Sequence, residues 1–169
     1  MVDYEQKGLC TPGALVRDGQ VRLFCQTYGR NGVADGILNA VSTVGLHFER
    51  NPTNLIFRPA ISGWSCGRAI DAEVVLFNQQ YFLYFATRDP SYRTQQLGVS
   101  VAPTHFNRDD WRQMTVEGPI LKPELPWEGE CIEGAWVVQR GNELVMFYAG
   151  AYNNWPQQID LARSKDGLH

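Results

Sequence analysis

The sequence predicts an all-β fold made of repeated antiparallel sheets, and three observations lead to this prediction. Apolar residues make up 44% and aromatic residues 12% of the 169 residues, a composition that suits half-buried pleated strands. No segment carries a sustained apolar period of about 3.6 residues, so we expect little helix. One pattern of apolar strand, turn, aromatic strand, polar loop and short Ser-containing strand occurs three times along the chain.

The three copies of this pattern are regularly spaced. Their paired apolar strands fall at 14–29, 73–89 and 135–150, and their outer strands at 37–50, 97–106 and 159–169. Five residues of the first copy recur 122 positions later: Ala40, Ser42, Gly45, Leu46 and His47 return as Ala162, Ser164, Gly167, Leu168 and His169. This spacing is two periods of about 61 residues, and a fixed internal period is typical of a repeat architecture.

A four-stranded antiparallel sheet of about 50–60 residues is the unit of a β-propeller. We therefore predict one partial propeller domain over residues 1–169, with three blades at approximately 11–57, 70–121 and 132–169. A β-sandwich is the alternative, but it does not require such a regular repeat. The loops at 51–68 and 119–134 are long enough to be expected to carry function.

Composition and charge exclude several classes of function. The net charge is −3, whereas a protein that binds nucleic acid needs a concentrated basic face. The four cysteines include no CxxC pair, so we predict no metal site and no cofactor. No apolar run reaches membrane-spanning length. No secretion signal is visible at the first residues, which leaves a cytoplasmic protein and an exported one without its signal both open.

The candidate catalytic residues come from aligning the repeats. The alignment puts Thr11, Asp71 and Glu133 at equivalent places, each just before the innermost strand of its sheet. Innermost strands line the axis of a propeller, so these side chains are expected to converge. Two carboxyl groups brought together can cleave a glycosidic bond, because one donates a proton while another stays ionised.

The order of these motifs resembles the five-bladed propellers of glycoside hydrolase families 43 and 32. Glu133-Gly134-Ala135 followed by Phe147-Tyr148 is similar to the family 43 element that carries the general acid, which implies this role for Glu133. The element Ile70-Asp71-Ala72-Glu73 resembles the one that supplies a pKa modulator. The resemblance implies this role for Asp71, with Glu73 as an alternative.

One element departs from these families. Their first blade carries an Asp-Pro whose Asp is the base or nucleophile, and this chain has Thr11-Pro12 there. Threonine cannot accept a proton from water at neutral pH or form a glycosyl ester. The base then comes from elsewhere, with Glu73, Asp89 and Glu130 as candidates, or it is missing. The departure favours a water-mediated inverting mechanism over a covalent retaining one.

Other residues have both functional and structural interpretations. Arg68 is expected to support the site or to pair with Asp71, and Asp89, in Arg88-Asp89-Pro90, can simply form a turn. Aromatic residues in loops often stack on sugar rings, which makes four of them candidate substrate-binding residues: Trp64, Trp127, Tyr152 and Trp155. Trp136 lies inside an apolar strand, so we expect it in the core.

The sequence thus predicts a glycoside hydrolase-like domain that acts on a polysaccharide or oligosaccharide. The alternative is a non-catalytic carbohydrate-binding or structural propeller that has lost its base. The third repeat stops at Gly167-Leu168-His169, before the outer strand of its sheet is complete. Open sheet faces and edges favour association, so we expect a homo-oligomer, most simply a two-fold dimer.

Overall fold

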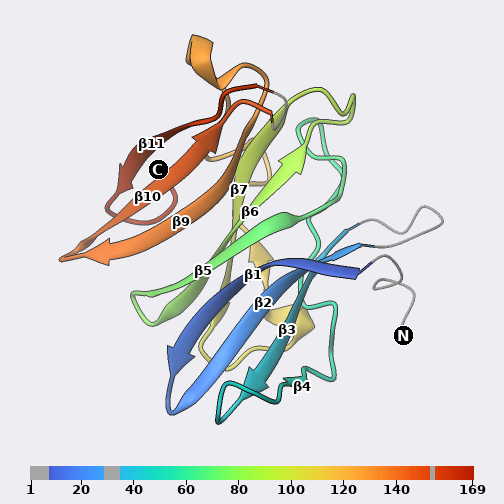
Figure 1. The fold of residues 1–169 in the computed structure, drawn as a ribbon, viewed down its shortest axis with the longest axis vertical. Coiled ribbons are helices and arrows are strands. Elements are labelled where there is room, and N and C mark those ends of the chain that lie inside the picture. Colours follow the sequence, from blue (N-terminus) through green and yellow to red (C-terminus); the bar gives the residue numbers. More distant parts are fainter. Residues whose placement is uncertain (1–7, 29–34, 153–154) are drawn as a thin grey trace.

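The computed structural model describes residues 8–28, 35–152 and 155–169. They form three antiparallel sheets that follow one another along the chain (Figure 1). The first sheet contains β1 (Gly8–Arg17), β2 (Gln20–Tyr28), β3 (Ile37–Ser42) and β4 (Glu49–Arg50). The second contains β5 (Ile70–Phe77), β6 (Gln80–Arg88), β7 (Gln95–Pro103) and β8 (Arg112–Gln113). The third contains β9 (Ile132–Arg140), β10 (Glu143–Gly150) and β11 (Gln158–Ser164).

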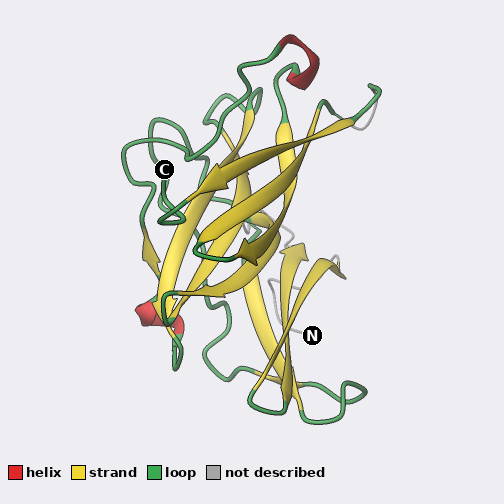
Figure 2. Cartoon of the chain, turned by 90° about the vertical axis from the view of Figure 1, so that its left-hand side faces the viewer, coloured by secondary structure: helices red, strands yellow, loops and turns green. Residues whose placement is uncertain are grey.

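In each sheet the strands pair in chain order, so every sheet is a simple meander. The helical elements among the described residues are two short 3₁₀ helices, Arg108–Asp110 and Pro126–Glu128, which lie far apart in the molecule (Figure 2). The all-β prediction is therefore confirmed. In the described part of the chain the third sheet has three strands, with β11 at its edge, in agreement with the incomplete outer strand expected for this repeat.

The second sheet lies between the other two and is covered on both faces. One core, which includes Phe24, Trp64 and Phe85, joins it to the first sheet. A second core, which includes Tyr84, Ile132 and Met146, joins it to the third. This placement explains why β6 is apolar almost throughout, since its alternate side chains enter two different cores. The innermost strands β1, β5 and β9 consequently lie next to one another in the centre of the molecule (Figure 1).

Among the residues that the structure describes, none covers the far face of the third sheet. Trp136, Phe147 and Leu161 are cross-strand neighbours on β9, β10 and β11, so their side chains share this face. Trp136 is 57% exposed, Leu161 47% and Ile159, also on β11, 76%. The expectation that Trp136 lies in the core is wrong, because the apolar pattern of β9 belongs to a strand with one covered and one open face.

Candidate active site

A β-bulge interrupts each innermost strand near its beginning. In β1 the bulge lies between Cys10 and Gly13, and in β5 between Ile70 and Glu73. Thr11 and Asp71 sit in these bulges with φ angles of 45° and 52°. Non-glycine residues seldom adopt such values, and backbone of this kind is often found at functional sites.

The bulge of β9 corrects the alignment of the repeats by one residue. Glu133 pairs with Ala149 of β10 in the same way that Ile70 pairs with Ala86 and Cys10 with Gln26. The residue at the position of Thr11 and Asp71 is therefore Gly134, whose φ is 61°. Glu133 lies one residue before this position, so Glu133 and Asp71 are not at equivalent positions of their strands.

A small pocket of about 190 Å³ lies where the three bulges meet. Its walls include Thr11, Asp71, Glu73 and Gly134, so all three sheets contribute. The Thr11 hydroxyl donates a hydrogen bond to Gln26 Oε1 at 3.0 Å, and the backbone N–H of Asp71 donates to the same oxygen at 3.4 Å. The three innermost strands thus place a carboxyl group from β5 beside residues of the first and third sheets.

Asp71 and Glu133 influence each other electrostatically. Burial and, to a lesser extent, the negative charge of Glu133 together raise the pKa of Asp71 to about 6, against smaller opposite effects from Thr11 and Arg68. The two principal catalytic candidates therefore lie near enough for the charge of Glu133 to act on Asp71.

Glu73 is the third carboxyl group at this place. Burial raises its pKa to about 7, although a hydrogen bond from the backbone N–H of Val137 acts in the opposite direction. That bond measures 3.3 Å and joins β5 to β9. Glu73 also faces β1, where the Cα of Gly13 approaches so closely that an added Cβ would lie 2.7 Å from Ala72 O and 3.6 Å from Glu73 Oε2.

Glu133 is held by two glutamine amides. Gln95 Nε2, from the second sheet, donates to Glu133 Oε2, and Gln157 Nε2 donates to Glu133 Oε1 at 3.2 Å. The buried Cys131 thiol is a further neighbour, and burial together with the charge of Glu133 raises the pKa of that thiol to about 12. Cys131 is therefore inert as a nucleophile at neutral pH.

A pocket of about 510 Å³, called the aromatic pocket below, lies between the segment 126–130 and the segment that follows β10. Trp127, Tyr152 and Trp155 line it together with Glu130. Trp127 stacks on Tyr148 with ring centroids 6.2 Å apart, and Trp155 is 66% exposed. Gln157 connects this pocket to Glu133, because its amide also donates to Ala151 O at 3.2 Å in the pocket wall. Three of the four aromatic residues expected to bind substrate therefore lie together.

Trp64, the fourth of these residues, lies elsewhere. It is 7% exposed, stacks on Phe85 in the core of the first two sheets, and donates from Nε1 to Val116 O at 3.3 Å. Its ring has no free face on which a sugar could stack. The loop that carries Trp64 folds back over the second sheet, and this is why a loop residue became a core residue.

The remaining predicted residues make local structural contacts. Asp89 accepts hydrogen bonds from the backbone N–H groups of Ser91, Arg93 and Thr94, which closes a turn. Glu130 pairs with Arg93 at 2.7 Å on the surface. Arg68 pairs with Asp35 at 2.8 Å and so does not form the expected ion pair with Asp71.

Sequence reasoning missed the glutamines that surround the carboxyl groups. Gln26 stands where the other two repeats have Ala86 and Ala149, so a polar residue in an apolar strand was a detectable signal. Gln95 gave no such signal, because its contact with Glu133 spans 38 positions and depends on the packing of two sheets.

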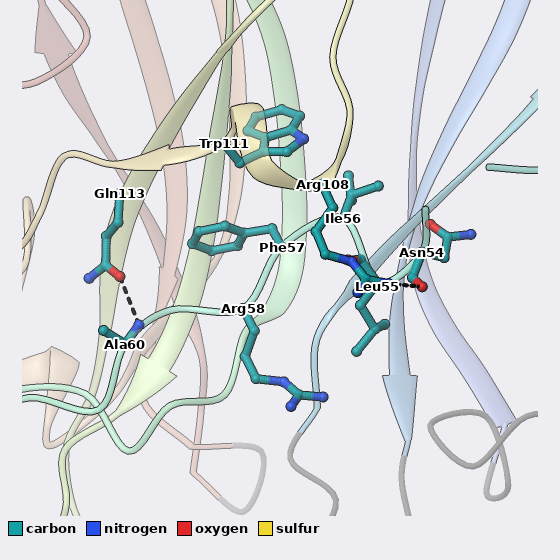
Figure 3. Close-up of a pocket in the computed structure, with 9 residues that line it drawn as sticks. All are labelled: Asn54, Leu55, Ile56, Phe57, Arg58, Ala60, Arg108, Trp111 and Gln113. Atoms are coloured by element: carbon teal, nitrogen blue, oxygen red, sulfur yellow. Dashed lines mark hydrogen bonds between the residues drawn. The ribbon is translucent and has the colours of Figure 1, made fainter. Parts of the chain in front are cut away.

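A further cavity, of about 550 Å³, contains none of the predicted catalytic residues. It lies between the segment 54–60 and the segment 108–113 (Figure 3). Its polar groups hold the chain in place: Arg108 Nε donates to Leu55 O at 2.8 Å, and Gln113 Oε1 accepts from Ala60 N at 2.9 Å.

Within residues 8–28, 35–152 and 155–169, no cluster of three or more His, Cys, Asp or Glu side chains could hold a metal ion. No helix of the described chain has the length and apolar character needed to cross a membrane.

Neither a family model nor a curated protein matches the chain, but solved structures resemble it. A family 117 glycoside hydrolase of the marine bacterium Zobellia galactanivorans has a TM-score of 0.75 and 16% identity, over 95% of this chain and 53% of that one. A family 32 β-fructofuranosidase of Bombyx mori has a TM-score of 0.71 and 14% identity, over 99% of this chain and 36% of that one. A β-1,2-mannobiose phosphorylase of Listeria innocua has a TM-score of 0.67 and 12% identity, over 95% and 56%.

The chain thus spans about half the length, or less, of the structures that it resembles. At these identities the likeness concerns the fold alone. Together with the three packed meanders, it shows that the chain has the fold of a partial β-propeller of the glycoside hydrolase type.

Proposed function

We propose that this chain is a glycosidase-like domain that acts on a polysaccharide or oligosaccharide. The observation that carries the proposal is the electrostatic coupling of Asp71 and Glu133 beside a pocket to which all three sheets contribute. The similar solved structures support a carbohydrate ligand, because they include hydrolases and a phosphorylase that act on glycosides.

In the proposed reaction Glu133 is the general acid. As the bond between the anomeric carbon and the leaving oxygen breaks, the proton of Glu133 passes to that oxygen. Burial and the negative charge of Glu133 raise the pKa of Asp71. Asp71 is proposed to support Glu133 through this interaction, without touching the leaving group.

Glu73 is the residue best suited to be the base. A water molecule would attack the anomeric carbon from the opposite side and lose its proton to Glu73, which gives inversion. A pKa of about 7 lies near the optimum for a base at neutral pH. Asp89 and Glu130 suit this role less, since both are engaged in surface contacts.

The aromatic pocket is proposed to hold the sugar next to the cleaved bond. Trp155 offers an exposed ring, and Tyr152 and Trp127 complete an apolar wall beside Gln157, which contacts Glu133. Sugar rings stack on such faces through their C–H groups, while their hydroxyl groups need polar partners such as the nearby glutamines.

One observation favours a second candidate function, a carbohydrate-binding domain without activity. Thr11 occupies the bulge position that holds a carboxyl group in β5, and its hydroxyl donates to Gln26. A hydroxyl group in this place cannot activate water at neutral pH. If Glu73 does not act as base, the chain would bind an oligosaccharide and leave it intact.

A substrate screen separates the two candidates. Aryl glycosides and arabinoxylan oligosaccharides are incubated with the protein and with Glu133→Gln, and released reducing sugar is measured. Turnover that is lost in Glu133→Gln supports the hydrolase. Binding by calorimetry without release, in both proteins, supports the binding domain, and neither binding nor release would refute both.

We also propose that the chain associates with a second copy of itself. The support is the uncovered apolar face formed by Trp136, Ile159 and Leu161, together with the free edge of β11. Glu133 is in the same cross-strand row as Ala149 and Ile159, so a second copy on this face would border the candidate site.

A further inference from the structure

The buried side chain of Gln95 contacts the carboxyl group of Glu133, which is partly buried. The Gln95 side chain lies at the beginning of β7, is 2% exposed, and donates from Nε2 to Glu133 Oε2. We propose that Gln95 is a positioning residue, which holds Oε2 of Glu133 so that Oε1 faces the substrate. This inference rests on the proposed role of Glu133 as general acid.

Arg88 fixes the direction in which the Gln95 amide points. Arg88 Nε donates to Gln95 Oε1 at 3.2 Å. A guanidinium group has only donors, so the amide oxygen must face Arg88 and the NH₂ group must face Glu133. Arg88 therefore orients the Gln95 amide so that its NH₂ group donates to the carboxyl group of Glu133. An amide turned by 180° would lose both hydrogen bonds.

The backbone around Gln95 is anchored on both sides. Gln95 pairs with Arg88 across β6 and β7, and its N–H donates to Glu130 O at 2.8 Å, in the segment that leads into β9. Gln95 also forms a parallel bridge with Cys131, two residues before Glu133. The donor and the acceptor therefore belong to backbone segments that are hydrogen-bonded to each other, which limits the movement of one relative to the other.

The two oxygens of Glu133 have different surroundings. Oε2 faces the buried Gln95, whereas Oε1 faces the exposed Gln157. A sugar entering from the aromatic pocket could displace Gln157 at little cost, because that amide can return to water. Displacing Gln95 would leave its buried NH₂ group without an acceptor, which is costly. Oε1 is therefore the oxygen available to hold and transfer the proton.

Arg88 links this arrangement to the aromatic pocket. Its guanidinium carbon lies 5.7 Å from the centroid of the Tyr152 ring, within the range of a cation–π interaction. Tyr152 in turn lines the pocket proposed to hold the sugar. One set of contacts thus fixes both a wall of the binding pocket and the orientation of the proton donor.

Nuclear magnetic resonance tests the contact without any substrate. In ¹H–¹⁵N spectra the side-chain NH₂ signals of Gln95 are identified by their loss in Gln95→Met, or by sequential assignment if that variant does not fold. We expect slow exchange of these protons with water, and a shift and faster exchange in Glu133→Ala. Signals of Gln96, whose amide donates to Trp64 O at 2.8 Å, should not change. Gln95 signals that are indifferent to Glu133→Ala would overturn the inference.

Kinetics test the consequence for the reaction. Gln95→Glu keeps an acceptor for Arg88 but removes the donor to Glu133, and Gln96→Leu is the matched control, a neighbouring buried amide. We expect kcat to fall by roughly 10- to 100-fold in Gln95→Glu with KM nearly unchanged, and a much smaller change in Gln96→Leu. Equal kcat in Gln95→Glu and the unmodified protein, or equal losses in both variants, would contradict a positioning role. A failure of the unmodified protein to turn over any substrate would refute the proposed function, while the resonance measurement would still decide the contact.

Discussion

The carboxyl group of Glu73 on β5 accepts a hydrogen bond from the backbone N–H of Val137 on β9, with 3.3 Å between the two atoms. This contact joins the innermost strands of two sheets and partly buries an acidic side chain between them. Burial outweighs the hydrogen bond and raises the pKa of Glu73 to about 7. The structure therefore holds a group that titrates near neutral pH at the centre of the candidate site.

This contact predicts a pH-dependent stability. Because the pKa of Glu73 is higher in the folded than in the unfolded chain, the folded state binds the proton more tightly, and its contribution to stability falls as the pH rises from about 4.5 to about 7. Glu73→Gln keeps an acceptor for Val137 and removes the titration. We expect the variant to be more stable than the unmodified protein at pH 8, on the order of 2 kcal/mol, and nearly equal at pH 4.

Urea unfolding at pH 4, 6 and 8 checks this expectation. Glu117→Gln, which changes an exposed carboxyl group, should follow the unmodified protein at every pH. A Glu73→Gln variant that is less stable at pH 8 would show that the ionised side chain stabilises the fold.

Glu133→Gln should lower turnover by roughly 100-fold or more, since the amide cannot donate a proton as an acid does. Gln at this position retains a carbonyl oxygen for the Gln95 amide, so the fold should be unchanged by circular dichroism. Aryl glycosides whose leaving groups need no protonation should lose least. A uniform loss across leaving groups would contradict proton donation by Glu133.

How far the sequence predicts this molecule depends on the kind of contact. The three sheets and their order follow from local patterns, because strands, hairpins and a regular repeat leave signals within about 60 residues. The equivalence of Thr11 and Asp71 could also be predicted. The sequence alignment of the repeats places Glu133 opposite Thr11 and Asp71, whereas the structure has Gly134 there, with the positive φ of the bulge. The position of a bulge is not visible in the apolar pattern of a strand.

The surroundings of the site could not be predicted for a different reason. Gln95 contacts Glu133, and Arg68 forms an ion pair with Asp35 instead of Asp71. Both contacts depend on how segments that are distant in the sequence pack together. The burial of Trp64 and Trp136 depends on packing in the same way. Trp64 is buried because its loop folds over the second sheet, and Trp136 is exposed because its face of the third sheet is open. Burial is a property of the assembled sheets, so a residue's own strand or loop does not determine it.

The aromatic pocket predicts where an oligosaccharide binds. Trp155→Ala removes the most exposed ring of the pocket and should weaken binding about 3- to 10-fold, the usual contribution of one aromatic face. Tyr92→Ala removes another exposed ring, 59% accessible, in the turn that Asp89 closes, and should have no effect. Isothermal calorimetry with the oligosaccharide found by the screen measures both. Equal affinity in Trp155→Ala and the unmodified protein would place the sugar elsewhere.

Self-association is the last prediction, and it follows from the open face of the third sheet. Trp136, Ile159 and Leu161 are 57%, 76% and 47% exposed, and they lie on one face of the third sheet, on the two strands β9 and β11 that flank β10. Fully burying one large apolar side chain contributes roughly 1.5–3 kcal/mol, so three on each copy provide a substantial driving force. We expect a dimer in light scattering behind a sizing column, and a monomer for Trp136→Asp. Leu46→Asp changes an equally apolar residue that is 80% exposed in the first sheet's loop, and it should leave the dimer intact. A monomer at every concentration, or a dimer that Trp136→Asp does not weaken, would mean that this face is not where two copies meet.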